Sequence, residues 1–299
     1  MGWRRMNVIT DEGTEGNRPP LSPSAIRDAA VSELDAVTSM VDSLTREEWP
    51  RPSGMAGRTI GDTVAHLVVS LPLYSQFLDA IVSGRAGGGM WKTLGDVSRA
   101  LAPMAGPALG ALSNAASKIT ASTVPPDTLK KQLANSAKSL REKLDAIDSG
   151  DYARTATWLG RPLPLASFLM LAVNDIGLSG WDIASALNPQ ARLDEPARQI
   201  LPWFYWSNPE MLHAAVSGTV MVELSGPTAT LSWTLAPTAV KPSQTPIETP
   251  DATITAGADT FVLTLAGRVS ALDALRFAAI LVSGNEELAR TFLQSWRML

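Results

Sequence analysis

The amino-acid sequence predicts a helical N-terminal domain followed by a small α+β domain. Through the first two-thirds of the 299 residues, apolar positions recur at helical spacing. After about residue 210 the apolar residues alternate instead, and two such runs flank Gly-Pro-Thr, which is typical of a β-hairpin. A chain of this length is expected to hold about two domains. We therefore predict a disordered lead-in over 1–22, a helical domain over 23–209 and an α+β domain over 210–299.

The helical domain is expected to begin with a helix over about 24–44, where Ile26, Leu34 and Val41 recur on one helical face. The next helix is expected over 59–84, because Thr59 and Asp62 can form a capping box at its start. In this motif each of the two side chains accepts a hydrogen bond from the backbone N–H of the other residue. Prolines and Asn-Pro pairs delimit the remaining predicted helices, at about 92–121, 126–149, 164–187 and 196–205.

The α+β domain is expected to open with the hairpin, whose strands span 218–226 and 229–237. A third strand is expected near Ala252 and leads into a helix. The runs 270–284 and 285–296 are predicted to be helical. The alternating spacing of apolar residues in these strands differs from the helical spacing before residue 210, which is why we separate the two domains.

Composition excludes several kinds of site. The formal charge is −4, from 25 basic and 29 acidic residues, whereas a general nucleic-acid binder needs a basic surface. The sequence has no cysteine, which rules out disulfides, thiolate metal sites, iron–sulfur ligation and a cysteine nucleophile. His66 and His213 are the only two histidines, so any catalytic or metal-binding imidazole must be one of them.

No targeting segment or membrane span is expected. The basic N-terminus is followed by no apolar run, unlike a secretory signal. The most apolar helical stretch, 163–187, is interrupted by Asn174, Asp175 and Asp182 and is therefore unsuited to a membrane span. We predict a cytoplasmic protein.

His66 is the first candidate for chemistry. It lies in an otherwise apolar helix, four residues after Asp62. A lone histidine on such a helix is more often a hydrogen-bonded core residue than a ligand, and a metal ligand would need partners from a facing helix. Asp175 and Ser179 are four residues apart and so share one face of a later helix. Aspartate is a suitable metal ligand, whereas serine is a poor one.

Two long segments resemble a known family. The run LTREEWPRPSGMAGRTIGDTVAHLV, with Trp49, Pro52 and the spacing from Asp62 to His66, resembles the second-helix entry of mycothiol-dependent maleylpyruvate isomerases and their DinB-like relatives. The run LAVNDIGLSGWDIASALN resembles their later helix. The C-terminal part, including 266–268 and 283–285, is similar to the sterol-carrier-like domain of the same family. The resemblance implies a DinB-like four-helix bundle followed by a sterol-carrier-like α+β domain.

The resemblance also implies a divalent metal, usually zinc, held by a histidine of the second helix and by a glutamate and a histidine of the later helix. His66 matches the first ligand. Asp175 stands in place of the glutamate and is one methylene shorter, and Ser179 stands in place of the second histidine. Two good ligands remain instead of three, so we predict a degenerate site that binds no metal tightly, with His66 and Asp175 as residual ligand candidates.

Further residues are candidates for substrate binding, and Ser179 is one of them. Trp206 and His213 belong to an aromatic segment near the predicted domain junction, where the aromatic rings either pack the domains together or line a cleft between them. Arg268 either pairs with an acid such as Asp273 or, as the resemblance implies, faces the interdomain cleft and binds an anionic thiol or substrate.

Three functions stay open. The first is a metal-independent enzyme of this family that isomerises, cyclises or adds a thiol to a small, partly apolar, anionic molecule in the interdomain cleft, with His66 and Asp175 as acid–base catalysts. The second is the family's own activity, in which a divalent metal activates mycothiol. The third is a non-catalytic protein that binds a hydrophobic ligand. We predict the first, with a small-molecule partner, no nucleic acid and no cofactor; mycothiol or zinc is expected only with the second.

Overall fold

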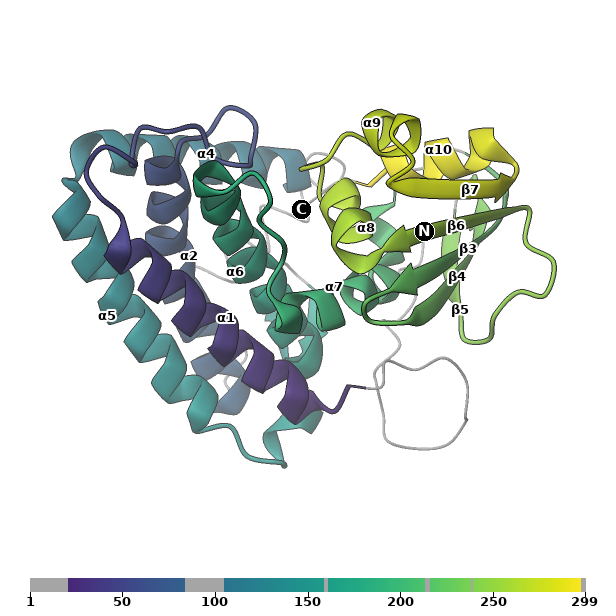
Figure 1. The fold of residues 1–299 in the computed structure, drawn as a ribbon. Helices are drawn as coiled ribbons and strands as arrows, with labels where there is room; N and C mark the ends of the chain where they lie inside the picture. The colour runs from purple at the N-terminus through teal and green to yellow at the C-terminus, as the bar shows by residue number, and fades with distance from the viewer. Residues whose placement is uncertain (1–20, 84–104, 159–160, 213–215, 238, 297–299) are drawn as a thin grey trace. The chain divides into compact units, whose positions relative to one another are not determined.

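The structure is a computed structural model that describes residues 21–83, 105–158, 161–212, 216–237 and 239–296 (Figure 1). Contacts within the described chain group into two compact units. The helical unit contains Leu21–Leu44 and Val64–Ile176, and the sheet unit contains Thr45–Thr63 and Gly177–Leu299. The unit boundaries fall inside two helices, and each unit is described by itself. The domain boundary predicted at residue 209 stays a prediction, because contact grouping does not measure independent folding.

The helical unit is built mainly from long helices. The helices predicted over 24–44, 59–84, 126–149 and 164–187 match helices of the structure closely. The helix predicted over 92–121 matches α4 only from Ala105, and its first residues lie outside the described residues. A short two-stranded antiparallel hairpin precedes the last of them. In chain order the elements are α1 (Pro23–Ser43), α2 (Ile60–Val82), α4 (Ala105–Thr123), α5 (Pro126–Asp145), a 3-10 turn (Asp151–Ala153), β1 (Thr155–Trp158), β2 (Arg161–Pro164) and α6 (Leu165–Leu187).

Local sequence signals account for these helices. Ser22 caps α1 by accepting a hydrogen bond from the Ala25 backbone N–H at 3.1 Å, and Pro23 follows it at the first helical position. The α5 helix buries one apolar stripe, which includes Leu133 and Leu140, and leaves its charged face exposed. This stripe packs on α1, and the two helices lie side by side in Figure 1.

The core between α2 and α6 is aromatic. Phe77 and Tyr74 of α2 contact Phe168 of α6, with ring centroids 4.7 and 5.7 Å apart. Lys143 of α5 forms an ion pair with Asp79 of α2, which joins a third helix to this group. Within the described residues, α2 is the one helix long and apolar enough to cross a membrane, and half of its most apolar window is buried, as in a core helix.

The sheet unit contains a mixed five-stranded sheet in the order β5-β4-β3-β6-β7. The pair β3–β6 is parallel and the other pairs are antiparallel. In chain order the elements after α6 are α7 (Glu195–Ser207), a 3-10 turn (Pro209–Met211), β3 (Gly218–Ser225), β4 (Ala229–Ala236), β5 (Ala239–Ser243), β6 (Ala252–Gly257), α8 (Ala258–Leu265), α9 (Ala271–Arg276), β7 (Ile280–Gly284) and α10 (Glu286–Gln294).

One face of this sheet is covered by helices of the C-terminal region. Val222 of β3 lies opposite Ile254 of β6, and both side chains are fully buried. The α8 and α10 helices pack on these central strands (Figure 1). Inner residues of β3 and β6 alternate with more exposed ones, as expected when one face of a sheet is covered and the other is open.

The predicted hairpin β3–β4 and the strand–helix pair β6–α8 are confirmed. The prediction of helix over 270–284 is wrong in its second half, because Ile280–Gly284 forms strand β7. Its alternation places Ile280 inward and Leu281 outward, and antiparallel pairing with β6 outweighs the short apolar run that resembled a helix. Strand β5 and the hairpin β1–β2 were not predicted. Most of the predicted lead-in, residues 1–20, lies outside the described residues.

Candidate active site

His66 and Asp175 form a buried pair inside the helical unit. His66 lies on α2 and Asp175 on α6, and the distance from His66 Nε2 to Asp175 Oδ1 is 2.8 Å. The two side chains are 15% and 21% exposed. An ionised carboxylate only accepts hydrogen bonds, so His66 Nε2 carries a proton and donates it in this contact. The prediction that these side chains face one another is confirmed, and their catalytic role stays a prediction.

Two hydroxyl side chains accompany this pair. His66, Ser70 and Tyr74 follow one another at four-residue intervals and therefore occupy one face of α2. The hydroxyls of Ser70 and Tyr74 are near enough to influence the Asp175 carboxylate, although Asp175 Oδ2 and Ser70 Oγ make no regular hydrogen bond among the described residues. Sequence reasoning missed both hydroxyls, and the repeated four-residue spacing was the signal that could have found them.

The electrostatics of the pair favour an ionised Asp175. Burial raises the pKa of this carboxyl, but the charge and hydrogen bond of His66 and the nearby hydroxyls of Tyr74 and Ser70 outweigh burial and lower the pKa to about 2. Burial and the Asp175 charge together raise the pKa of Tyr74 well above its ordinary value. At neutral pH the Asp175 carboxyl is therefore ionised and the Tyr74 phenol is protonated.

The donor set does not fit the metal site that the family resemblance implies. Within the part of the chain that the structure describes, no three His, Asp or Glu side chains gather as ligands of one ion. His66 and Asp175 are hydrogen-bonded to each other. Ser179 is buried one turn after Asp175 on α6 and offers a neutral hydroxyl, a weak ligand for zinc. These three side chains therefore do not supply the three ligands of the implied metal site.

The structure places Arg268 in a buried ion pair in the sheet unit. Its Nε and Nη2 atoms donate to the two carboxylate oxygens of Asp182 at 3.1 and 2.9 Å, and Nη1 donates to the Ala266 carbonyl oxygen at 2.9 Å. The side chains of Arg268 and Asp182 are 9% and 1% exposed. The acid that pairs with Arg268 is therefore Asp182 and not Asp273, which the sequence suggested. Asp273 lies in the first turn of α9, where its backbone N–H donates to the Ser270 hydroxyl.

A glycine turn leads directly to Arg268. The α8 helix ends with Gly267 at φ 69°, where the Gly267 N–H binds the Thr264 carbonyl and the Arg268 N–H binds the Leu263 carbonyl. This pair of hydrogen bonds is the Schellman motif, which favours glycine at the left-handed position. Sequence reasoning missed Asp182 as the partner because the two residues lie 86 positions apart.

The other predicted site residues are not assembled with His66 and Asp175 by any contact described here. Trp206 lies on α7 in the sheet unit, is largely buried, and packs edge-on against Trp203 with ring centroids 5.9 Å apart. This contact lies within α7, and the role of the aromatic segment stays a prediction. His213 lies outside the described residues.

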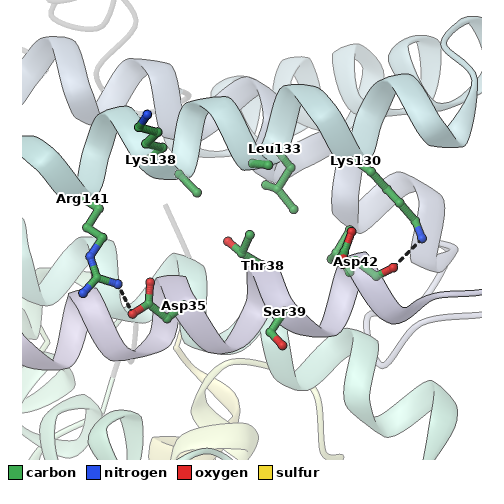
Figure 2. Close-up of a pocket in the computed structure, with 11 residues that line it drawn as sticks. Asp35, Thr38, Ser39, Asp42, Lys130, Leu133, Lys138 and Arg141 are labelled. Atoms are coloured by element: carbon green, nitrogen blue, oxygen red, sulfur yellow. Dashed lines mark hydrogen bonds and ion pairs between the residues drawn. The ribbon is translucent and has the colours of Figure 1, made fainter.

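A separate groove of about 430 Å³ lies between α1 and α5 (Figure 2). Arg141 pairs with Asp35 at one end, and Lys130 donates to the backbone carbonyl oxygen of Asp42 at the other. None of the predicted site residues lines this groove. The buried imidazole–carboxylate pair therefore remains the site with a chemical rationale.

Two solved structures share the overall fold. The crystal structure of a mycothiol-dependent maleylpyruvate isomerase matches with a TM-score of 0.56 and 13% identity, over 84% of this chain and 91% of that one. A histidine-to-alanine mutant of such an enzyme matches with a TM-score of 0.57 and 14% identity, over 88% and 93%. A palmitated sterol-carrier-type protein from Aedes aegypti matches with 25% identity and a TM-score of 0.22, over 27% and 72%.

The predicted fold class, a helical N-terminal part followed by an α+β part, is confirmed. A comparison with curated proteins gives no significant match. The sequence model of the mycothiol maleylpyruvate isomerase N-terminal domain matches residues 30–184. Because this match spans more than half of the 299 residues, the chain belongs to the mycothiol maleylpyruvate isomerase family.

Proposed function

We propose that this protein is a metal-independent proton-transfer enzyme of the maleylpyruvate isomerase family, acting on a small and partly apolar molecule. The observation that carries the proposal is the 2.8 Å hydrogen bond between His66 Nε2 and Asp175 Oδ1. It joins an ionised carboxylate to an imidazole in a site from which most solvent is excluded. Such a pair is suited to general acid–base catalysis.

The proposed chemistry follows from the roles of the two side chains. Asp175 accepts a hydrogen bond from Nε2, which orients the imidazole, and stabilises the imidazolium that forms when the ring takes a proton from the substrate. The same imidazolium then returns the proton at a different atom of the substrate, which is an isomerisation. A positioned acid–base group of this kind contributes about 10²–10⁴ to the rate.

The surroundings of the pair favour a partly apolar substrate. Tyr74 contacts Phe168, which also contacts Phe77, so aromatic surface adjoins the polar pair. We infer an anionic substrate only from the family resemblance, since the arginine that the resemblance offered for this purpose already binds Asp182. Cyclisation or thiol addition would use the same proton transfers and stays within the proposal.

The first substrate to test is maleylpyruvate, with and without mycothiol, because the solved relatives are named for that reaction. We expect turnover that survives exhaustive chelation and is not increased by added zinc. His66→Gln and Asp175→Asn should each lower kcat by roughly a hundredfold. Asp79→Asn is the matched control, because it removes an α2 carboxylate that pairs with Lys143.

Two results would contradict the proposal. One is activity that is lost on chelation and recovered with stoichiometric zinc, which would restore the family's metal chemistry. The other is full activity of both dyad variants. If maleylpyruvate is not a substrate, nitrogen chemical shifts of the His66 ring still test the dyad, since the proposal requires the proton on Nε2 in wild type and a changed tautomer balance in Asp175→Asn.

A further inference from the structure

The two edges of the five-stranded sheet differ in how they are protected. The outer strand β5 carries Lys241 and Pro242, a charge and a residue without an N–H, both of which hinder pairing with another strand. The opposite outer strand β7 has the sequence Ile-Leu-Val-Ser-Gly and contains neither. Among the described residues no strand pairs with its outer side. One edge is therefore blocked and the other is open.

Exposed apolar side chains gather beside the open edge. Phe277 is 72% exposed, Leu281 is 57% exposed and Leu272 is 53% exposed. They make up three of the four large apolar side chains exposed in the described chain. Leu281 lies on β7, Leu272 lies on α9, which packs on β7, and Phe277 directly follows α9. Single exposed apolar residues are ordinary, but a cluster along an unprotected strand edge marks an interaction surface.

The charges at the two ends of β7 are of opposite sign. Arg276 precedes the strand, with its guanidinium 5.5 Å from the centre of the Phe277 ring. Glu286 and Glu287 follow the strand at the start of α10, where Glu287 already pairs with Arg290, and Arg276 and both glutamates are exposed. When two identical strands pair in antiparallel fashion, the start of each lies beside the end of the other. Two β7 strands paired in this way would bring each Arg276 toward the glutamates of the second copy.

We propose that β7 is a self-pairing edge, through which two copies of this chain join their sheets in antiparallel fashion around a two-fold axis near Val282. The pairing satisfies the free backbone edge of both strands, covers the exposed apolar side chains and matches the end charges. Because β5 blocks the other edge, the five-stranded sheet of each molecule has one open edge, and association through it stops at a closed dimer rather than a filament. This inference is independent of the catalytic proposal.

The test is the mass of the full chain in solution, measured by light scattering and by sedimentation over a dilution series. We expect a dimer for the wild-type protein. Leu281→Lys, which places a charge on the pairing strand, should weaken dimerisation by at least about tenfold and leave the circular dichroism spectrum unchanged. Ile119→Lys is the matched control, because Ile119 is an exposed apolar residue on α4, and this variant should remain dimeric.

A charge exchange tests the antiparallel arrangement. Arg276→Glu and Glu286→Arg should each weaken the dimer, and the double variant should recover it, because only antiparallel self-pairing brings these two positions together. A wild-type chain that stays monomeric at every concentration overturns the proposal. So does a dimer that Leu281→Lys leaves intact, or a double charge variant that is no better than the two single ones.

Discussion

At the scale of single residues, the His66–Asp175 contact determines the chemistry of the site. A carboxylate that is buried without compensation is costly, and its pKa would rise. Here the hydrogen bond from His66 and the neighbouring hydroxyls of Ser70 and Tyr74 reverse that effect. Each partner therefore keeps the other in a defined state, which is the condition for an imidazole to work as a base.

We expect this contact to make stability depend on pH in the acid range. The folded-state pKa of Asp175 lies at about 2, below the ordinary value of about 4. The contribution is therefore fully present above the ordinary value and is lost as pH falls through about 2. Its size is roughly 2 kcal/mol. Urea unfolding between neutral and strongly acidic pH should show Asp175→Asn less stable than wild type, by a difference that shrinks on acidification. A stability difference between Asp175→Asn and wild type that stays constant with pH would contradict this prediction.

The departures from the family's ligand pattern give a second residue-scale prediction. Asp175→Glu with Ser179→His restores a carboxylate and an imidazole one helical turn apart on α6, opposite His66. We expect this double variant to bind zinc about a hundredfold more tightly than wild type, which corresponds to about 2.7 kcal/mol. Calorimetric titration measures the affinity, and zinc should raise the melting temperature of the variant alone. Equal affinities would mean that the two positions do not face His66.

At the scale of elements, two helices end in the same motif with different residues. The α9 helix closes with hydrogen bonds from Ala278 N to the Leu275 oxygen and from Ala279 N to the Ala274 oxygen, which repeats the Schellman pattern at the end of α8. At the left-handed position α8 has Gly267, with φ 69°, whereas α9 has Ala278, with φ 54°. A Cβ in this conformation costs about 1–2 kcal/mol.

These two ends provide reciprocal substitutions. Ala278→Gly should stabilise the protein by up to roughly 1 kcal/mol, because relief of the left-handed alanine exceeds the greater backbone entropy of glycine in the unfolded chain. Gly267→Ala should destabilise it by a similar amount through backbone conformation alone, since a Cβ there meets no atom within 4 Å. Denaturant unfolding measures the free energy of unfolding of both variants. If both substitutions change stability in the same direction, the left-handed position does not determine their effects.

Elements were predictable where the local sequence carried the signal. Thr59 and Asp62 exchange hydrogen bonds at the start of α2, with Asp62 N to Thr59 Oγ1 at 3.1 Å and Thr59 N to Asp62 Oδ2 at 2.8 Å, as the spacing predicted. The β7 strand was not predictable in this way. Its five residues are too few to distinguish the period of a strand from that of a helix, and its conformation depends on β6, which lies some 30 residues earlier in the chain.

At the scale of the whole molecule, the partners of the candidate site residues depend on contacts that the sequence does not display. His66 and Asp175 are 109 positions apart. The search for a ligand on a facing helix, and then the family resemblance, suggested this pair from the sequence. No comparable signal connected Arg268 with Asp182, so the arginine was assigned to substrate binding. The structure gives it a partner that is almost fully buried. Local patterns therefore predicted the elements, and long-range packing decided which polar groups meet.

The Arg268–Asp182 pair joins three distant segments of the sheet unit. The guanidinium reaches Asp182 on α6, and its Nη2 atom also lies 3.7 Å from Met55 Sδ in the loop between α1 and α2. The backbone of this loop is held to the same helical turn, because Gly54 N–H donates to the Asp182 carbonyl oxygen at 2.8 Å. A buried pair with these contacts should be sensitive to the loss of one partner.

We expect Arg268→Ala to destabilise the full chain by about 3–5 kcal/mol, because it leaves the Asp182 carboxylate buried without its countercharge. Replacing both partners with apolar residues of similar size, as in Arg268→Met with Asp182→Leu, should recover most of that loss, since no charge is then buried. Denaturant unfolding measures both effects, and proteolysis near Met55 should increase in the single variant. If Arg268→Ala costs less than 1 kcal/mol, or if the double variant is as unstable as the single one, the ion pair is not what holds these segments together.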